Sequence, residues 1–133
     1  MTRADYERYV AAFNARDYDT LFAFFADDVV LDAGGAMRGK QVIRDFYRFF
    51  HEHVRETVTL LHFYPDENGA MADVMIRFEG LKDLTQEMLD ARGHGHMTPV
   101  PKGGSVDIEF FIQYRQQGPL IRHIKGAVFT PAA

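Results

Sequence analysis

The first part of the chain carries apolar residues at spacings of three and four, the period of an amphipathic helix. This pattern predicts three helices, over residues 3–15, 17–26 and 39–54. Thr2, followed three residues later by Asp5, resembles a capping box at the start of the first helix, and Asp17 can cap the second. A short apolar strand at 29–31 and a glycine-rich turn separate the second helix from the third.

From Glu56 onward the pattern alternates with a period of two, which is typical of β-strands. It predicts two antiparallel hairpins, with strands over residues 57–64, 70–81, 106–115 and 120–129. Asn68-Gly69 is a good signal for the first hairpin turn. Residues 82–104, between the hairpins, are polar and rich in Gly and Pro, and they predict a long loop with one helical turn near 85–89. We expect this loop to act as a lid, or else to be an insertion without a role.

The resulting element order is α-α-β-α-β-β-β-β. Helices that precede antiparallel hairpins predict an α+β fold, in which a cone-shaped, curved and mostly antiparallel sheet packs against three N-terminal helices. We expect residues 1–133 to form a single domain, because this length suits one core and no linker or repeat divides the chain.

Composition narrows the class of function. Hydrophobic residues make up 47% of the chain, with twelve Phe and six Tyr, so bulky rings can line a cavity as well as fill a core. The formal net charge of −4 lacks the basic field that nucleic-acid binding requires. No apolar run approaches the roughly 20 residues of a membrane span. We therefore expect a cytoplasmic protein without nucleic-acid or membrane partners. The absence of Cys excludes disulfides and a cysteine nucleophile.

Several segments carry a family resemblance. They are Tyr9 to Phe13 with Ala15-Arg16-Asp17, Leu21 to Phe25 with Ala26-Asp27-Asp28-Val29, Gly39 to Tyr47, and the closing hairpin Ile108 to Phe129. In spacing they resemble the nuclear-transport-factor-2-like superfamily, in particular its SnoaL-like polyketide cyclase and ketosteroid isomerase branch. The resemblance covers most of the chain and implies the cone-shaped α+β fold. It specifies activity poorly, because the superfamily includes isomerases, cyclases, hydrolases, dehydratases and binding domains.

The resemblance also implies site residues. Tyr9 stands where ketosteroid isomerases carry the tyrosine that donates to the developing dienolate oxygen, and Tyr47 matches the tyrosine that supports it. The catalytic aspartate of those enzymes falls on Ala33 and their second aspartate on Phe110, so a true steroid isomerase is not expected. Asp32 becomes a candidate base if the shorter turn after it lets the side chain rotate inward. The alternatives are two core tyrosines and a solvated Asp32.

The last strand supplies further candidates. Strict alternation places four residues on one face, namely Ile121, His123, Lys125 and Ala127. SnoaL-like relatives often carry a working acid or base on the concave side of this strand, and an imidazole at His123 suits proton transfer near neutrality. Lys125 would pair with Asp32 or bind an anionic ligand group. The alternatives are a structural His123 and, with the faces reversed, a solvated Lys125. No metal or cofactor is expected, because His94 and His96 match no ligand motif.

The helical stripes and the inward strand positions predict the walls of an apolar pocket. These walls include Tyr9, Tyr47 and His123, named above. The further wall residues are Phe13, Phe25, Leu31, Phe46, Val74, Ile76, Phe78, Ile108, Phe110 and Ile112. Two functions stay open. One is a cofactor-free isomerase, cyclase or dehydratase that acts by acid-base chemistry on a small apolar molecule. The other is a non-catalytic ligand-binding or dimerisation domain. We expect a homodimer through the opposite face of the sheet, which mixes apolar groups with charges able to pair across strands.

Overall fold

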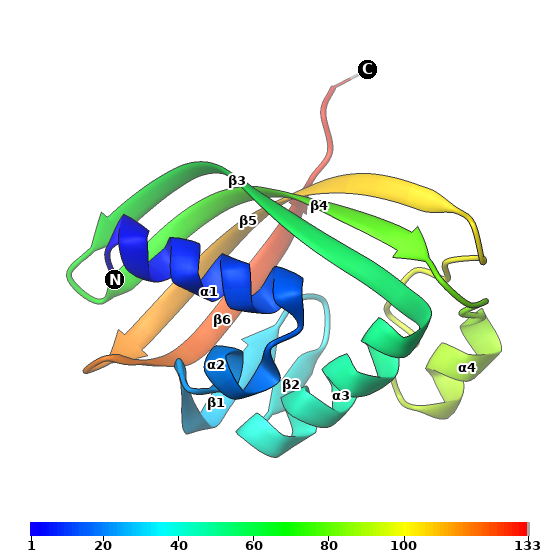
Figure 1. The fold of residues 1–133 in the computed structure, drawn as a ribbon, viewed down its shortest axis with the longest axis horizontal. Coiled ribbons are helices and arrows are strands. Elements are labelled where there is room, and N and C mark those ends of the chain that lie inside the picture. Colours follow the sequence, from blue (N-terminus) through cyan, green and yellow to red (C-terminus); the bar gives the residue numbers. More distant parts are fainter. Residues whose placement is uncertain (133) are drawn as a thin grey trace.

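The computed structural model describes residues 1–132, which form helices on one side of a single curved sheet (Figure 1). The elements in chain order are α1 (Arg3–Ala15), α2 (Tyr18–Phe22), β1 (Phe25–Asp32), β2 (Ala36–Arg38), α3 (Lys40–His53), β3 (Val54–Asp66), β4 (Gly69–Gly80), α4 (Gln86–Ala91), β5 (Ser105–Gln117) and β6 (Leu120–Phe129).

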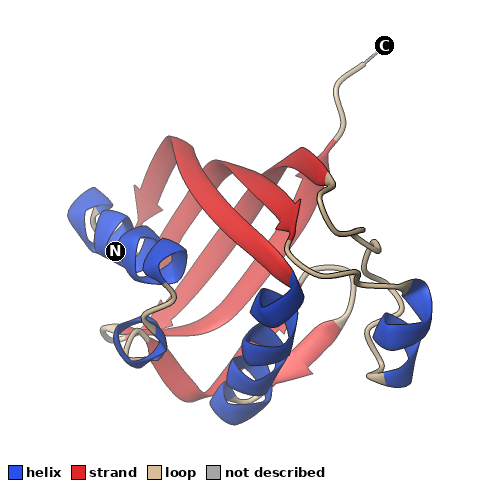
Figure 2. Cartoon of the chain, turned by 45° about the vertical axis from the view of Figure 1, so that its right-hand side comes forward, coloured by secondary structure: helices blue, strands red, loops and turns tan. Residues whose placement is uncertain are grey.

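The sheet has six strands in the order β2-β1-β6-β5-β4-β3. Every neighbouring pair is antiparallel except β1 and β6, which run parallel. The strands curl around α1, α2 and α3, and α4 lies beside the end of α3 (Figure 2). The predicted α+β architecture with a mostly antiparallel sheet is therefore confirmed.

Local signals at the chain start behave as the sequence predicts. Thr2 and Asp5 form a reciprocal capping box, in which the Asp5 backbone N–H donates to Thr2 Oγ1 at 3.1 Å and the Thr2 N–H donates to Asp5 Oδ2 at 3.0 Å. Arg16 ends α1 in a left-handed conformation, with φ of 58°. The buried face of α1 then meets the sheet.

The interior consists of two apolar clusters. The first lies between α1, α2 and the sheet and contains Tyr6, Tyr9, Ala12, Phe13, Leu21, Phe22, Phe25, Val29, Ile43, Ala72, Val74, Ile76, Tyr114, Ile121 and Ile124. The second joins α3 to the long loop and contains Phe46, Phe49, Phe50, Val54, Leu84, Leu89 and Val100. Much of the long loop is therefore anchored, because three of its side chains are core residues.

Two predictions near the chain start are wrong in detail. The second helix ends at Phe22, and residues 23–26 do not continue it. Phe25 instead begins β1 by pairing with Ile121 of β6, a contact that local helical spacing cannot reveal. The short strand β2, which pairs with β1 through Val30 and Arg38, was not predicted at all. For Phe25, a partner distant in sequence decides the local conformation.

A bulge in β6 reverses the predicted faces of its C-terminal half. Gln116 pairs with Ile121 and Arg115 pairs with His123, so Arg122 is an extra residue in the ladder. One extra residue moves every following side chain to the other face. Ile121 and Ile124 are therefore both buried on the inner face. His123 lies on the outer face, opposite Val30 and Arg115, contrary to its predicted place in the pocket.

The outer face of the sheet mixes apolar and charged groups as predicted. Arg77 of β4 and Asp107 of β5 form an ion pair across the strands at 2.8 Å. Phe111 and Phe129 pack edge to face with ring centroids 5.6 Å apart, and they remain 39% and 43% exposed. Asp73 is buried, and the neighbouring carboxyl of Asp73 raises the pKa of Glu109.

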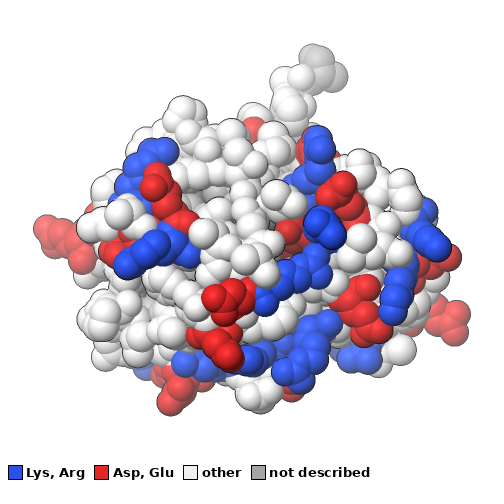
Figure 3. All heavy atoms as spheres, viewed as in Figure 1, with Lys and Arg blue, Asp and Glu red and all other residues white. Residues whose placement is uncertain are grey.

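The charged side chains on the helical side are interspersed rather than segregated (Figure 3). Several form ion pairs there, including Arg44 with Asp19 and Arg8 with Asp5. Over residues 1–132, no helix combines the length and the apolar character needed to cross a membrane.

Candidate functional site

A cavity of about 270 Å³ opens between α3, the inner face of the sheet and the long loop. Its walls are mostly apolar. They are formed by Leu31, Ala33, Gly35, Met37, Phe46, Tyr47, Phe50, Glu56, Ile76, Phe78, His96, Met97, Thr98, Val100, Val106, Ile108, Phe110, Ile112, Ile124, Gly126 and Val128. Within residues 1–132 no Lys or Arg lines this cavity. An apolar cavity with few polar groups is the usual form of a small-molecule site.

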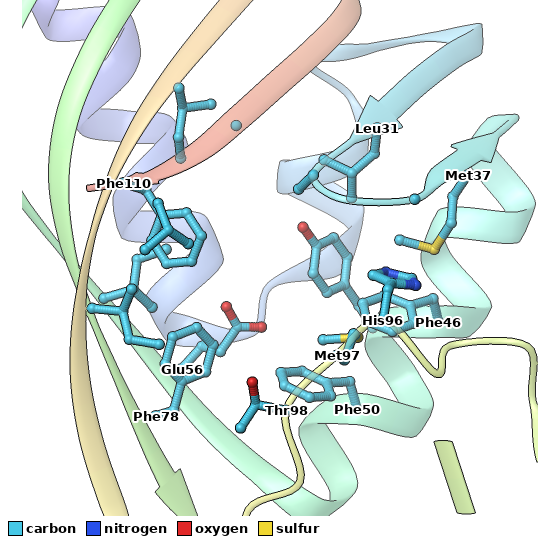
Figure 4. A pocket seen from close by; sticks show the side chains of 18 of the residues that line it. Leu31, Met37, Phe46, Phe50, Glu56, Phe78, His96, Met97, Thr98 and Phe110 are labelled. Atoms are coloured by element: carbon cyan, nitrogen blue, oxygen red, sulfur yellow. The ribbon is translucent and has the colours of Figure 1, made fainter. Parts of the chain in front are cut away.

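Glu56 is the carboxylate of this cavity. It is the third residue of β3 and pairs with Phe78 of β4, so both side chains face inward. Only 9% of Glu56 is exposed, and its carboxylate points into the cavity near Phe78 and Phe110 (Figure 4). A carboxylate in such surroundings is costly unless a donor satisfies it.

His51 is the donor that reaches Glu56. Its Nε2 lies 2.9 Å from Glu56 Oε1, and its Nδ1 lies 2.8 Å from the hydroxyl of Tyr18. The imidazole is 4% exposed. A chain of hydrogen bonds therefore runs from α2 through α3 to the cavity.

Tyr47 contributes the phenol of the cavity wall. Burial raises the pKa of Tyr47 well above its usual range, and the nearby Tyr9, Glu56 and Tyr18 add to the rise. The hydroxyl therefore stays protonated at neutral pH and can donate a hydrogen bond to a ligand oxygen.

A group of tyrosines lies behind the cavity. The hydroxyls of Tyr6 and Tyr114 are 2.9 Å apart, and the ring of Tyr9 packs against both. Burial raises the pKa of Tyr6 to about 12, although its hydrogen bond to Tyr114 opposes the rise. Tyr9 is 7% exposed and belongs to the core cluster. Tyr9 therefore does not line the cavity.

The long loop closes one side of the cavity. A backbone bridge between Leu84 and Val100 holds its two ends together. The N–H of each residue donates to the carbonyl oxygen of the other, with an N···O distance of 3.0 Å in both cases. Between these ends, His96 crosses Gly35 so closely that a Cβ on Gly35 would lie 2.8 Å from the imidazole. Met97 and Thr98 follow along the cavity wall. We call residues 94–98 the loop tip.

The other predicted site residues divide into three groups. Leu31, Phe46, Ile76, Phe78, Ile108, Phe110 and Ile112 line the cavity together with Tyr47. Phe13, Phe25 and Val74 belong to the core cluster and do not reach the cavity. Asp32, His123 and Lys125 lie on the outer face. Asp32 of β1 stands opposite Lys125 of β6 in the parallel strand ladder. The expected inward rotation of Asp32 does not occur, and the β6 bulge carries Lys125 outward with His123.

Sequence patterns contained a signal for the residues that were missed. Glu56 stands two residues before Val58, so the period of two places both side chains on the inner face. His51 follows Tyr47 by four residues, one helical turn later on the same face of α3. What the patterns could not show is that β3 begins at Val54, directly after α3, which brings His51 and Glu56 together.

A comparison with known protein families shows to which family the chain belongs. The family described as the SnoaL-like domain matches residues 6–123. The chain is a SnoaL-like domain. Among curated proteins, none is significantly similar to it in sequence.

Solved structures resemble this SnoaL-like domain in fold. A protein from Pseudomonas putida KT2440 assigned as a polyketide cyclase is 19% identical, with a TM-score of 0.74 over 94% of this chain and 87% of its own. A Catenulispora acidiphila protein with a ketosteroid isomerase-like fold, in complex with trimethylamine, is 14% identical, with a TM-score of 0.70 over 95% and 85%. A Mycobacterium tuberculosis protein in complex with estradiol-17β-hemisuccinate is 18% identical, with a TM-score of 0.68 over 90% and 87%. At these identities the likeness shows the fold alone.

Proposed function

We propose that this SnoaL-like domain is a cofactor-free enzyme that moves a proton on a small apolar carbonyl compound. The observation that carries the proposal is Glu56, the single carboxylate among the described residues that line this mostly apolar cavity, which accepts a hydrogen bond from His51. Glu56 replaces Asp32 and His123 as the candidate base, because those two side chains lie on the outer face.

Each group has a role in such a reaction. Glu56 takes a proton from the carbon next to the carbonyl, and the electron pair of the broken C–H bond forms the C=C bond of an enolate. Tyr47 donates a hydrogen bond to the oxygen on which the negative charge develops. Return of the proton to another carbon gives an isomer. In a dehydration, the C–O bond of a β-hydroxyl breaks, the hydroxyl takes the proton from Glu56 and water leaves. Tyr47 takes the donor role that the family resemblance implies for Tyr9, because Tyr47 lines the cavity and Tyr9 does not.

The competing function is non-catalytic binding of a small apolar ligand in the same cavity. The complexes of two structural neighbours with estradiol-17β-hemisuccinate and with trimethylamine support ligand binding by this fold. Proton exchange separates the two functions. In D₂O, an enzyme of the proposed class replaces the α-hydrogens of monocyclic, bicyclic and tetracyclic ketones with deuterium, which ¹H NMR detects as loss of signal. Ligands that bind without such exchange would support the binding function, and native mass spectrometry of the purified protein identifies any molecule that copurifies.

We further propose that the loop tip gates the cavity. Deleting the whole loop would remove Leu84, Leu89 and Val100 from the core, so a change at the tip is the better test. His96→Ala is expected to speed release of a fluorescent apolar ligand by about tenfold, a change of about 1.4 kcal/mol, because the imidazole no longer crosses Gly35. Stopped-flow fluorescence measures the release. Glu87→Ala on the exposed side of α4 is the matched control, and equal release rates in both variants would exclude the gate.

A homodimer through the outer face of the sheet is also proposed. Phe111 and Phe129 would form the apolar centre of the contact, with the pair of Arg77 and Asp107 at its side. An isologous contact places each Phe111 near its counterpart around the two-fold axis. Phe111→Arg is expected to convert a dimer into a monomer by light scattering at micromolar concentration, because two arginines would repel each other there. Val42→Arg, at an exposed position of α3 on the helical side of the domain, is the control and should leave the dimer intact.

A further inference from the structure

The hydrogen bonds of Tyr18, His51 and Glu56 satisfy both nitrogens of a buried imidazole and also reach the cavity. One imidazole nitrogen bonds to an element on the outside of the domain, and the other bonds to the only carboxylate that lines the described cavity. Because Tyr18 is half-buried on α2 and does not line the cavity, these hydrogen bonds link the cavity with the partly exposed side of α2.

The imidazole has little freedom to turn. Its ring stacks between Tyr18, at 6.0 Å and 3°, and Tyr47, at 5.1 Å and 15°. The edge of Phe13 closes a third side, with a centroid distance of 5.4 Å. The Arg16 guanidinium donates to the backbone oxygens of His51 and Val54, which fixes the junction between α3 and β3. Both the ring and its backbone are therefore held.

The Glu56 carboxylate can only accept a hydrogen bond, and this assigns the protons along the series Tyr18, His51 and Glu56. The Tyr18 hydroxyl has two acceptors, Nδ1 of His51 at 2.8 Å and the backbone oxygen of Tyr47 at 3.4 Å, and the shorter contact is the stronger. Nε2 therefore carries the proton of the neutral imidazole and donates a hydrogen bond to Glu56 Oε1, while Nδ1 accepts from the Tyr18 hydroxyl. Oε2 is then the carboxylate oxygen left for a ligand. Other polar groups near Glu56 are the protonated phenols of Tyr9 on α1 and Tyr47 on α3.

We propose that His51, locked by Tyr18, is a positioning residue that holds the Glu56 carboxylate with Oε2 directed at the bound molecule. The inference rests on the proposed function, because it assigns Glu56 the acting role. It extends the machinery of the site to two residues that touch no substrate. Orientation of this kind matters because a misplacement of about 1 Å can cost on the order of a hundredfold in rate.

A reactive probe tests the proposal without any knowledge of the substrate. Styrene oxide is small and apolar, and a correctly aimed carboxylate opens it. Glu56 Oε2 forms an ester bond to an epoxide carbon, the ring C–O bond breaks, and the released alkoxide takes a proton from water. Mass spectrometry of the intact protein gives the rate of labelling, and peptide mapping assigns the label to Glu56.

The expected result is rapid labelling of Glu56 in the natural protein and labelling slower by on the order of tenfold or more in His51→Leu. Tyr18→Phe, which keeps the stacking ring and loses the hydroxyl, should also be slower. His51→Gln restores an N–H donor and should recover much of the rate, which a purely structural role would not explain. His53→Leu, two residues along α3, is the control, because His53 bonds to the Phe49 carbonyl and not to Glu56.

The outcomes also separate this inference from the proposed function. Equal labelling of Glu56 in the natural protein and in folded His51→Leu and Tyr18→Phe would overturn the inference, and so would no labelling of Glu56 at all. The proposed function is judged separately by ketone exchange in D₂O. If His51→Leu slows labelling while no ketone exchanges, the positioning role stands and the proposed function fails.

Discussion

Replacing Glu56 by Gln is expected to lower the rate of α-hydrogen exchange of bound ketones by about 10²–10⁴-fold, the usual contribution of a positioned acid or base. Gln has nearly the same shape, and its carbonyl oxygen can still accept from Nε2 of His51, so the fold and the cavity should persist. The loss should therefore appear in the rate at saturating ketone, with little change in ligand affinity. ¹H NMR in D₂O measures the first quantity and isothermal titration calorimetry the second.

Glu79→Gln provides the matched control for this prediction. Glu79 lies on β4 next to Phe78, but its side chain belongs to the outer face of the sheet. The control variant should exchange ketones at the rate of the natural protein. Full exchange activity in Glu56→Gln would show that another group moves the proton.

A larger side chain on the sheet wall of the cavity is expected to weaken ligand binding strongly. Gly126 of β6 lines the cavity, and a Cβ built there would meet Ala33 Cβ and Ile112 Cγ1 at 3.7 Å, an ordinary contact. Gly126→Leu therefore fits the backbone while its side chain occupies space meant for the ligand. We expect affinity for an apolar ligand to fall by about a hundredfold or more, which is roughly 2.8 kcal/mol. The melting temperature should change little, because the added methyl groups enter a cavity and not a close-packed core.

Ala127→Leu is the control for the cavity-filling variant. Ala127 is the next residue along β6, and its side chain lies on the outer face beside Phe111. The same added bulk on that side should leave the affinity per protomer unchanged. If Gly126→Leu binds the ligand as tightly as Ala127→Leu does, the ligand does not occupy this cavity.

Sequence periodicity predicts the framework of the site because local spacing determines helices and hairpins. The stripe of α3 and the alternation of β4 place Phe46, Tyr47, Ile76 and Phe78 correctly around the cavity. Asn68-Gly69 likewise predicts the turn between β3 and β4. In these segments, the side chains that a local rule groups together also share one face of the folded chain.

The acid-base groups of the site depend on features that local rules miss. One extra residue at Arg122 turns His123 and Lys125 outward, and this bulge is defined only by pairing with β5. Glu56 gains its role from the direct passage of α3 into β3, which brings His51 within 2.9 Å. The family resemblance implies acid-base candidates on β1 and β6, whereas the carboxylate that lines this cavity comes from β3.

A crystal structure of the protein with a bound, non-exchanging cyclic ketone tests the central claim most directly. The account predicts that the carbonyl oxygen lies within hydrogen-bond distance of the Tyr47 hydroxyl and that the neighbouring carbon faces Oε2 of Glu56. The apolar rings should extend towards Val106 and Val128, which are exposed apolar residues of the cavity wall. A ketone bound outside the cavity, or one whose carbonyl points to the loop tip and away from Tyr47 and Glu56, would contradict the account.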